Sequence, residues 1–132
     1  MHCGEAFKRL GCELKVPRTD WSAQKDGGVW LTLWRGGIDW MADPLTLDTS
    51  VEERRAGDWV RKPGNQKRRR HIEYALANCG GWVEAIIVDG DSSGEVEKAT
   101  PWQPAERRGL RWRVVSHDPE TGHFAASAFK PD

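Results

Sequence analysis

Residues 21–35 show the clearest alternation of side chains in the chain and predict a β-hairpin. From residue 29 to residue 34 an aliphatic side chain stands at every second position, with two tryptophans and a threonine between them. Successive side chains of a strand point to opposite faces, so both faces of this strand are largely apolar. Asp26-Gly27 lies just before it, and an Asp-Gly pair between β-forming segments is typical of a tight hairpin turn. We therefore expect a hairpin whose second strand is central in a sheet or covered on both faces.

Residues 66–78 have the spacing of an amphipathic helix, with signals for both of its ends. Asn65 follows Pro63-Gly64 and is a good N-cap residue, and Gly80-Gly81 provides the stop. An apolar, β-branched strand over residues 82–88 comes directly afterwards.

The apolar positions of this helix indicate which face it buries. Ile72, Ala75 and Leu76 recur at helical spacing. We expect them to pack against the sheet that contains Ile86 and Val88.

The rest of the chain predicts shorter elements and one long connection. We expect a short helix and three further strands, at residues 4–11, 38–41, 110–116 and 123–129. A polar turn over residues 118–122 joins the last two strands. Residues 43–64 are predicted to be a largely irregular connection. This order of elements predicts a single α+β domain over residues 1–132, with a curled, mostly antiparallel sheet, one main helix and a short N-terminal helix.

Composition narrows the class of protein. The 132 residues carry equal numbers of acidic and basic side chains, and a hydrophobic content of 38% is enough for a core. Three cysteines without a Cys-x-x-Cys pair favour reduced thiols over a disulfide framework. Because no long apolar run is present, we expect neither a signal peptide nor a membrane span, and we expect a cytoplasmic protein.

The charge is concentrated in one place although the net charge is zero. Residues 61–71 carry six formal positive charges and no acid. The six cations are Arg61, Lys62, Lys67, Arg68, Arg69 and Arg70. Four of them fill the first turn of the predicted helix, where the helix dipole favours anions rather than cations. This pattern indicates a phosphate-binding surface, and its alternative is a solvated face neutralised by nearby acids.

Tryptophan is unusually frequent, with eight residues in 132. Trp30, Trp82 and Trp112 lie inside strand patterns, so we expect them in the core or on a face of the sheet. The others lie near turns or loop edges, where an indole can stack on an unpaired base: Trp21, Trp34, Trp40, Trp59 and Trp102. Among these, Trp34, Trp40 and Trp59 are the candidates for stacking beside the basic run.

Catalytic signatures are weak. Asp39 with Asp43, and Asp89 with Asp91, could hold a hard metal ion. No zinc-type spacing, nucleophile elbow or phosphate-binding glycine loop is present. We therefore expect a binding module rather than an enzyme, with no cofactor.

Two stretches of the chain resemble small PUA-like modules, which include EVE-type and SRA-type readers and occur alone or fused to HNH endonucleases. The first is Trp21-Ser-Ala with Asp26-Gly27 and residues 29–35; the second runs from Pro63-Gly-Asn to Cys79-Gly-Gly and continues at residues 85–88. The closing hairpin, residues 110–129, extends the resemblance. The resemblance implies a curled β-barrel with flanking helices, and binding of modified bases of DNA or RNA in an aromatic pocket.

The leading hypothesis is a nucleic-acid-binding module whose basic run contacts phosphates and whose tryptophans stack on a modified or flipped base of DNA or RNA. The first alternative is a small accessory module, of the phage or mobile-element type, whose basic face meets an acidic protein. A weaker alternative is a metal-dependent hydrolase that uses Asp39, Asp43, Asp89 or Asp91.

Overall fold

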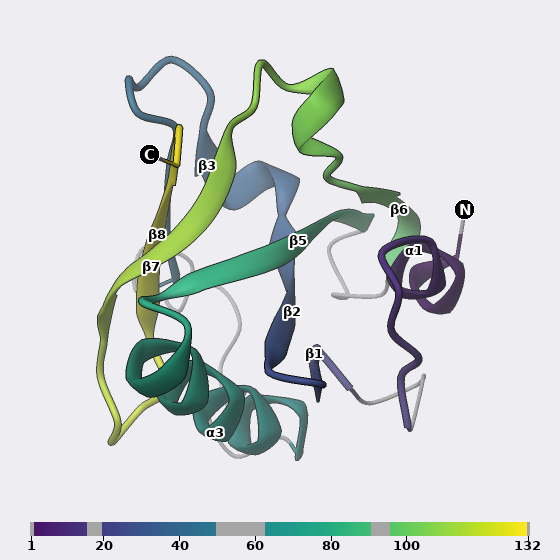
Figure 1. Ribbon diagram of the computed structural model, residues 1–132, viewed down its shortest axis with the longest axis vertical. Coiled ribbons are helices and arrows are strands. Elements are labelled where there is room, and N and C mark those ends of the chain that lie inside the picture. Colours follow the sequence, from purple (N-terminus) through teal and green to yellow (C-terminus); the bar gives the residue numbers. More distant parts are fainter. Residues whose placement is uncertain (1, 16–19, 50–62, 91–95, 132) are drawn as a thin grey trace.

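The computed structural model describes residues 2–15, 20–49, 63–90 and 96–131, which form an α+β domain (Figure 1). Its helices are α1 (Cys3–Arg9) and α3 (Pro63–Asn78), with short 3-10 turns η1 (Arg35–Gly37) and η3 (Pro104–Glu106). Its strands are β1 (Ser22–Lys25), β2 (Gly28–Trp34), β3 (Ile38–Asp39), β4 (Thr46–Asp48), β5 (Trp82–Gly90), β6 (Val96–Pro101), β7 (Arg111–His117) and β8 (Phe124–Phe129). In these described residues, no helix is both long enough and apolar enough to cross a membrane.

The strands form one eight-stranded sheet in the order β1-β2-β5-β7-β8-β4-β3, with β6 also paired to β5. The β2–β5 pair is parallel, and the other described pairs are antiparallel. Parallel neighbours need a crossover connection, and the segment between β2 and β5 contains α3. The sheet is open, with β1 and β3 at its two ends. The predicted α+β class and the mostly antiparallel sheet are confirmed.

The β1–β2 hairpin forms where the Asp-Gly pair predicted it. Asp26 and Gly27 have φ angles of 48° and 82°, and Lys25 pairs with Gly28 across the turn. Two consecutive positive φ angles are the signature of the type I′ turn, which matches the twist of the flanking strands. The second strand, β2, lies between β1 and β5, as its two apolar faces required.

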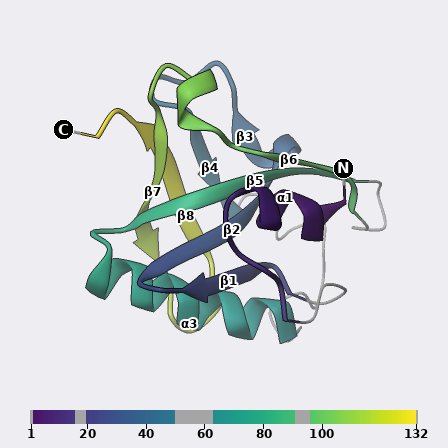
Figure 2. The same ribbon diagram turned by 45° about the vertical axis from the view of Figure 1, so that its right-hand side comes forward.

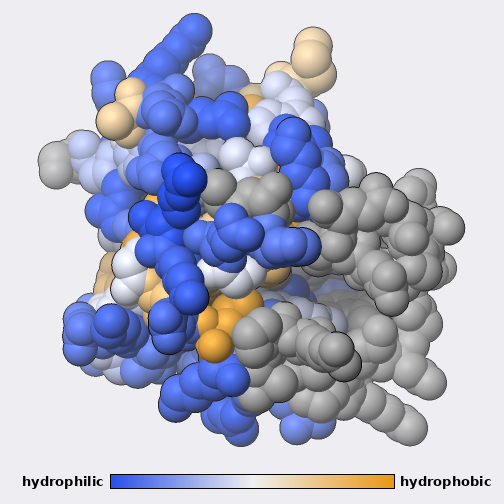
Figure 3. Space-filling view, turned by 90° about the vertical axis from the view of Figure 1, so that its right-hand side faces the viewer, coloured by the Kyte–Doolittle hydropathy of each residue, from blue (hydrophilic) through white to orange (hydrophobic). Residues whose placement is uncertain are grey.

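The sheet is covered on both faces, and β5 separates two hydrophobic clusters. On its inner face Val83, Ala85 and Ile87 join the main core with α3, whereas on its outer face Ile86 and Val88 pack with α1. Figure 2 shows β2 and β5 running side by side, with α1 and α3 on different sides of them. Seen from the side of α1, most of the coloured surface is hydrophilic around a small hydrophobic patch (Figure 3). The polar side of α1 therefore faces solvent and its apolar side closes the outer cluster.

The helix α3 differs from its prediction in the residues it buries. Ile72 and Ala75 are fully buried as expected, but Leu76 is 42% exposed. The buried stripe runs through Arg68, Ile72 and Ala75. Successive residues of a helix lie about 100° apart around its axis, so Leu76, which follows Ala75, points out of the core. The helix packs on the sheet that contains Ile86 and Val88, as predicted, and it does so on the inner face of β5, whereas Ile86 and Val88 point to the outer face.

The start of α3 is also corrected. The helix begins at Pro63, a residue suited to the first helical position, so Asn65 lies within the first turn and is not the N-cap. The Asn65 amide donates to the carbonyl of Thr121, and its Oδ1 accepts from Arg68. This side chain therefore holds the helix against the β7–β8 turn.

Two strands were not predicted. The segment expected to be irregular contains β4, and β6 follows the polar turn after β5. β4 has three residues, and β6 ends in Pro101, which cannot donate to a ladder. Both lack the apolar alternation that identifies a strand.

Candidate functional site

Much of the basic run on α3 contacts the protein itself. The Lys67 ammonium lies 2.7 Å from Oδ1 of Asp20, whose side chain is buried. The Arg69 guanidinium donates to the backbone carbonyl of Pro119 in the β7–β8 turn. These two cations link α3 to the segment before β1 and to the turn before β8.

Arg68 lies in the core. It is 5% exposed, and its guanidinium carbon is 4.9 Å from the ring centre of Trp21 and 5.0 Å from that of Phe124. Burial lowers the pKa of Arg68 to about 9. A guanidinium placed between two aromatic rings is a packing element, and it is inaccessible to a phosphate from solvent.

The solvent-facing part of the described basic run is consequently small. Arg70 is exposed, and Lys67 and Arg69 are partly exposed. Arg61 and Lys62 lie outside the described residues. The density of charge in the sequence therefore overstates the density of charge on the described surface.

The structure separates the candidate stacking rings from this run. Trp40 is 37% exposed, which confirms the expectation that one candidate ring faces solvent, whereas Trp34 is half-buried in the outer cluster. Trp59 lies outside the described residues. In Figures 1 and 2, β3 and the loop after it, which carries Trp40, lie at the end of the molecule opposite α3. Trp40 therefore lies away from the start of α3, and the expectation that one of the three candidate rings lies within reach of it stays a prediction, because Trp59 lies outside the described residues.

Trp40 instead belongs to a small polar cluster near η1. Its Nε1 donates to the carbonyl of Arg35 at 3.1 Å, and the Arg35 guanidinium carbon lies 5.5 Å from the ring centre. Arg35 is also ion-paired with Asp89 at 3.0 Å.

Trp102, another predicted surface ring, is 3% exposed and packs edge-on against the buried Trp112.

The described acids do not assemble a metal site. Asp39 and Asp43 are exposed, Asp89 is paired with Arg35, and Asp91 lies outside the described residues. Within residues 2–15, 20–49, 63–90 and 96–131, no group of three or more His, Cys, Asp and Glu side chains could hold a metal ion. The hydrolase alternative therefore gains no support from this part of the chain.

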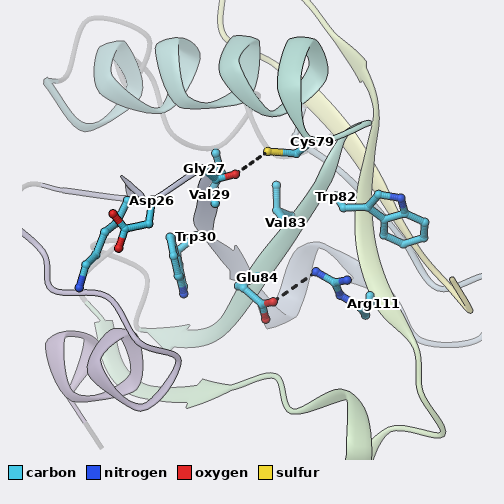
Figure 4. Close-up of a pocket in the computed structure, with 11 residues that line it drawn as sticks. Asp26, Gly27, Val29, Trp30, Cys79, Trp82, Val83, Glu84 and Arg111 are labelled. Carbon is cyan, nitrogen blue, oxygen red and sulfur yellow. Dashed lines mark hydrogen bonds and ion pairs between the residues drawn. The ribbon is translucent and has the colours of Figure 1, made fainter.

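A different site lies on the outer face of the sheet, where α1 does not cover it. A pocket of about 410 Å³, here called the tryptophan pocket, opens between the β1–β2 hairpin, the end of α3, β5 and β7. It is lined by residues 25–30, Cys79, residues 82–84 and Arg111. Figure 4 shows Trp30, Glu84 and Arg111 across it in that order, with the Trp82 ring on the Arg111 side.

Strand register explains why these three side chains meet. Trp30 of β2 is paired with Glu84 of β5, and Arg111 of β7 lies one residue beyond the paired Trp112. The three side chains thus form a row across three adjacent strands on one face of the sheet. Arg111 Nη2 lies 3.3 Å from Glu84 Oε1, and both side chains are about one-third exposed, at 37% and 30%.

The neighbouring row of side chains explains how the Trp30 ring is accommodated on this face. The same register places Gly28 opposite Trp82, which is paired with Arg113. Gly28 has no side chain, and a Cβ there would lie 3.1 Å from the Trp30 ring. The missing side chain therefore leaves room for the Trp30 ring itself to lie over Gly28.

Several contacts hold the walls of the tryptophan pocket in place. Trp30 Nε1 donates to the carbonyl of Leu10 at 2.9 Å, which fixes the indole against the segment after α1. Cys79 Sγ donates to the carbonyl of Gly27 at 3.2 Å and so ties the end of α3 to the hairpin. The guanidinium carbons of Arg111 and Arg113 lie 5.8 and 5.6 Å from the Trp82 ring centre.

Sequence reasoning missed this site because it assigned Trp30 and Trp82 to the core or a sheet face and did not count them among the rings that could stack on a ligand. Both rings are only partly buried, whereas Trp112 is fully buried as predicted. A signal was present in the pattern Trp82-x-Glu84 followed by Arg111-x-Arg113. Charged residues at the same alternate positions of two strands indicate a face that no helix covers.

A second, smaller pocket of about 330 Å³ lies beside the β7–β8 turn and includes His117, His123, Asp48 and Asp118. Burial lowers the pKa of His117, and the Arg69 and Arg68 charges act in the same direction while Glu73 and Asp118 oppose them. Thr49 Oγ1 lies 3.1 Å from Nδ1 of His123. Both carboxylates and imidazoles line this pocket, so it is neither uniformly acidic nor uniformly basic.

Comparison of the chain with protein-family models, curated proteins and solved structures finds no match. The tryptophan pocket combines an indole face, a carboxylate acceptor and guanidinium donors on adjacent strands. These are the groups that recognise a planar, polar, heteroaromatic ligand.

Proposed function

We propose that the protein is a nucleic-acid-binding module that holds an unpaired base of DNA or RNA in the tryptophan pocket. The row of Trp30, Glu84 and Arg111 beside a hollow of about 410 Å³ carries this proposal. Small-molecule sites commonly measure about 300–1,000 Å³, so the hollow has room for a nucleotide. A base that stacks on Trp30 would present its hydrogen-bonding edge to Glu84 and Arg111.

Cations around this site would contact the phosphates on either side of the base. Lys25 is exposed and lines the tryptophan pocket. Arg113 is exposed in the neighbouring row of side chains, where it is paired with Trp82. Along α3, Arg70 lies nine residues before Cys79, roughly 14 Å along the helix axis. A strand that leaves the pocket along α3 would therefore reach Arg70 and Lys67. Arg61 and Lys62, which lie outside the described residues, remain proposed phosphate contacts.

A PUA-like arrangement is part of this proposal. The mostly antiparallel sheet with helices on both faces is compatible with it. In that arrangement the tryptophan pocket, rather than the Trp40 loop, would take the modified or flipped base.

The apolar tip after β3 favours a second candidate function, binding of another protein. Trp40 is 37% exposed and Met41 95% exposed. The two side chains follow one another in a loop at the end of the molecule away from α3 (Figure 1). Substitution of Trp40 therefore serves as the matched control for the nucleic-acid proposal.

The proposal predicts that Trp30→Leu weakens binding of a fluorescein-labelled single-stranded oligonucleotide by roughly 5- to 150-fold, because base stacking contributes about 1–3 kcal/mol. Trp40→Leu should leave the affinity unchanged. Fluorescence anisotropy gives both affinities, and near-UV circular dichroism checks that each variant is folded. Equal affinities for wild type and a folded Trp30→Leu variant would contradict the proposed site.

A further inference from the structure

We infer that the tryptophan pocket selects guanine over the other bases through the paired Glu84 and Arg111. This inference deepens the proposed function and rests on it. Its basis is the order of hydrogen-bonding groups across the sheet, which the strand register fixes.

The Glu84–Arg111 pair presents acceptors beside donors. Arg111 Nη2 approaches Oε1 of Glu84 at 3.3 Å, and both side chains are about one-third exposed inside the pocket. An ionised carboxylate only accepts hydrogen bonds, and a guanidinium only donates them. Across the row from β5 to β7, the order is therefore carboxylate acceptors and then guanidinium donors (Figure 4).

Guanine has the complementary edge. Its N1–H and N2 amino groups are adjacent donors that a carboxylate can accept together, and O6 beside them is an acceptor for a guanidinium. Uracil and thymine offer one N–H between two carbonyl oxygens, which the carboxylate would repel. Adenine and cytosine offer one amino group beside a ring-nitrogen acceptor, so a carboxylate finds a single donor there.

Contacts around the pair keep the two groups in place before a ligand binds. The guanidinium carbon of Arg111 lies 5.8 Å from the Trp82 ring centre, and Trp30 adjoins Glu84 through the β2–β5 register. Pre-positioned donors and acceptors lose little conformational entropy on binding. A carboxylate near phosphates opposes binding in general, so its value lies in discrimination between bases rather than in affinity.

The test uses labelled single-stranded pentanucleotides with uridine at the four outer positions. The central nucleotide is guanosine, inosine, adenosine, cytidine or uridine, and the last of these is the all-uridine ligand. We expect the guanine ligand to bind roughly 5- to 100-fold more tightly than the all-uridine ligand, as a bidentate contact allows. Inosine lacks the N2 amino group, and it should lose about fivefold or more of the guanine affinity.

Substitution of Glu84 tests whether its carboxylate causes the preference for guanine. Glu84→Gln should reduce the preference for guanine to under about threefold and leave binding of the all-uridine ligand within about twofold of wild type. Glu106→Gln, at an exposed position of η3 outside the pocket, is the matched control and should keep the full preference.

The outcomes separate the two proposals. Binding without a guanine preference, or a guanine preference that survives Glu84→Gln, would overturn the inference and leave the proposed function standing. If the wild type binds none of the pentanucleotides, both the guanine preference and the proposed function are overturned.

Discussion

Arg68 shows how far the role of a residue can differ from the role its neighbours suggest. In the sequence it is the centre of a run of cations, but in the structure it is 5% exposed and lies between the rings of Trp21 and Phe124. Its guanidinium also donates to Asn65. These contacts join α3 to β8 and to the residue before β1, so the residue contributes to stability rather than to a phosphate site.

We predict that Arg68→Ala lowers the free energy of unfolding by about 2–4 kcal/mol, because buried packing, ring contacts and a hydrogen bond are lost together. Arg70→Ala, at an exposed position of the same helix, should change it by less than about 0.5 kcal/mol. Urea unfolding of both variants checks this pair. A similar small effect at both positions would show that Arg68 does not hold the helix in place.

At the scale of elements, one histidine of α3 bonds to β1, and a second histidine lies partly buried at the end of β7. His71 Nδ1 lies 2.6 Å from Ser22 Oγ of β1, and His117 ends β7 near α3. Burial lowers the pKa of each histidine. Around His71, the Arg70, Lys67 and Lys15 charges act in the same direction and Asp20 opposes them.

The sign of the pH dependence follows from these shifts. A histidine whose pKa is lower in the folded state binds fewer protons there than in the unfolded chain. Its contribution to stability is complete above the unfolded value of about 6.5 and is lost as the pH falls through the folded value. We predict that the wild type loses stability between about pH 7 and about pH 5, and that His71→Gln with His117→Gln makes this loss smaller. Urea unfolding across that range tests it, and an unchanged slope in the double variant would exclude these histidines as the cause.

Elements with a strong local pattern could be predicted from the sequence. The β1–β2 hairpin was predictable because Asp26 and Gly27 supply the positive φ angles that a type I′ turn requires. The face of α3 was only partly predictable, because Arg68 rather than Leu76 completes its buried stripe. Periodicity cannot show that an arginine will be enclosed by two aromatic rings from distant segments.

The site could be predicted less well than the fold. Trp30 and Trp82 lie in regular strands, and whether such rings are covered depends on where α1 packs. The short α1 covers Ile86 and Val88 but leaves Glu84 partly exposed. How much of the outer face α1 covers is set by tertiary packing. In the sequence, only the charged residues at alternate positions of β5 and β7 indicated where the covered part ends.

For the whole molecule, the position of β5 connects fold and proposed function. Its inner face carries the main core with α3, and its outer face is divided between the cluster under α1 and the tryptophan pocket. The buried residues keep three strands in register, and that register sets the row of Trp30, Glu84 and Arg111. The core thus fixes the geometry of the pocket, while the side chains of Trp30, Glu84 and Arg111 are only partly buried.

The central claim is that nucleic acid binds at the tryptophan pocket, and a two-dimensional NMR titration tests it most directly. Each tryptophan indole N–H gives its own signal in a nitrogen-15-labelled sample, and Trp30→Leu and Trp40→Leu assign the two that matter. On addition of a single-stranded oligonucleotide, we predict that the Trp30 indole signal and the backbone amides of Glu84 and Arg111 shift, while the Trp40 indole signal does not. Shifts confined to Trp40 and the first turn of α3, or no shifts at all, would contradict the account.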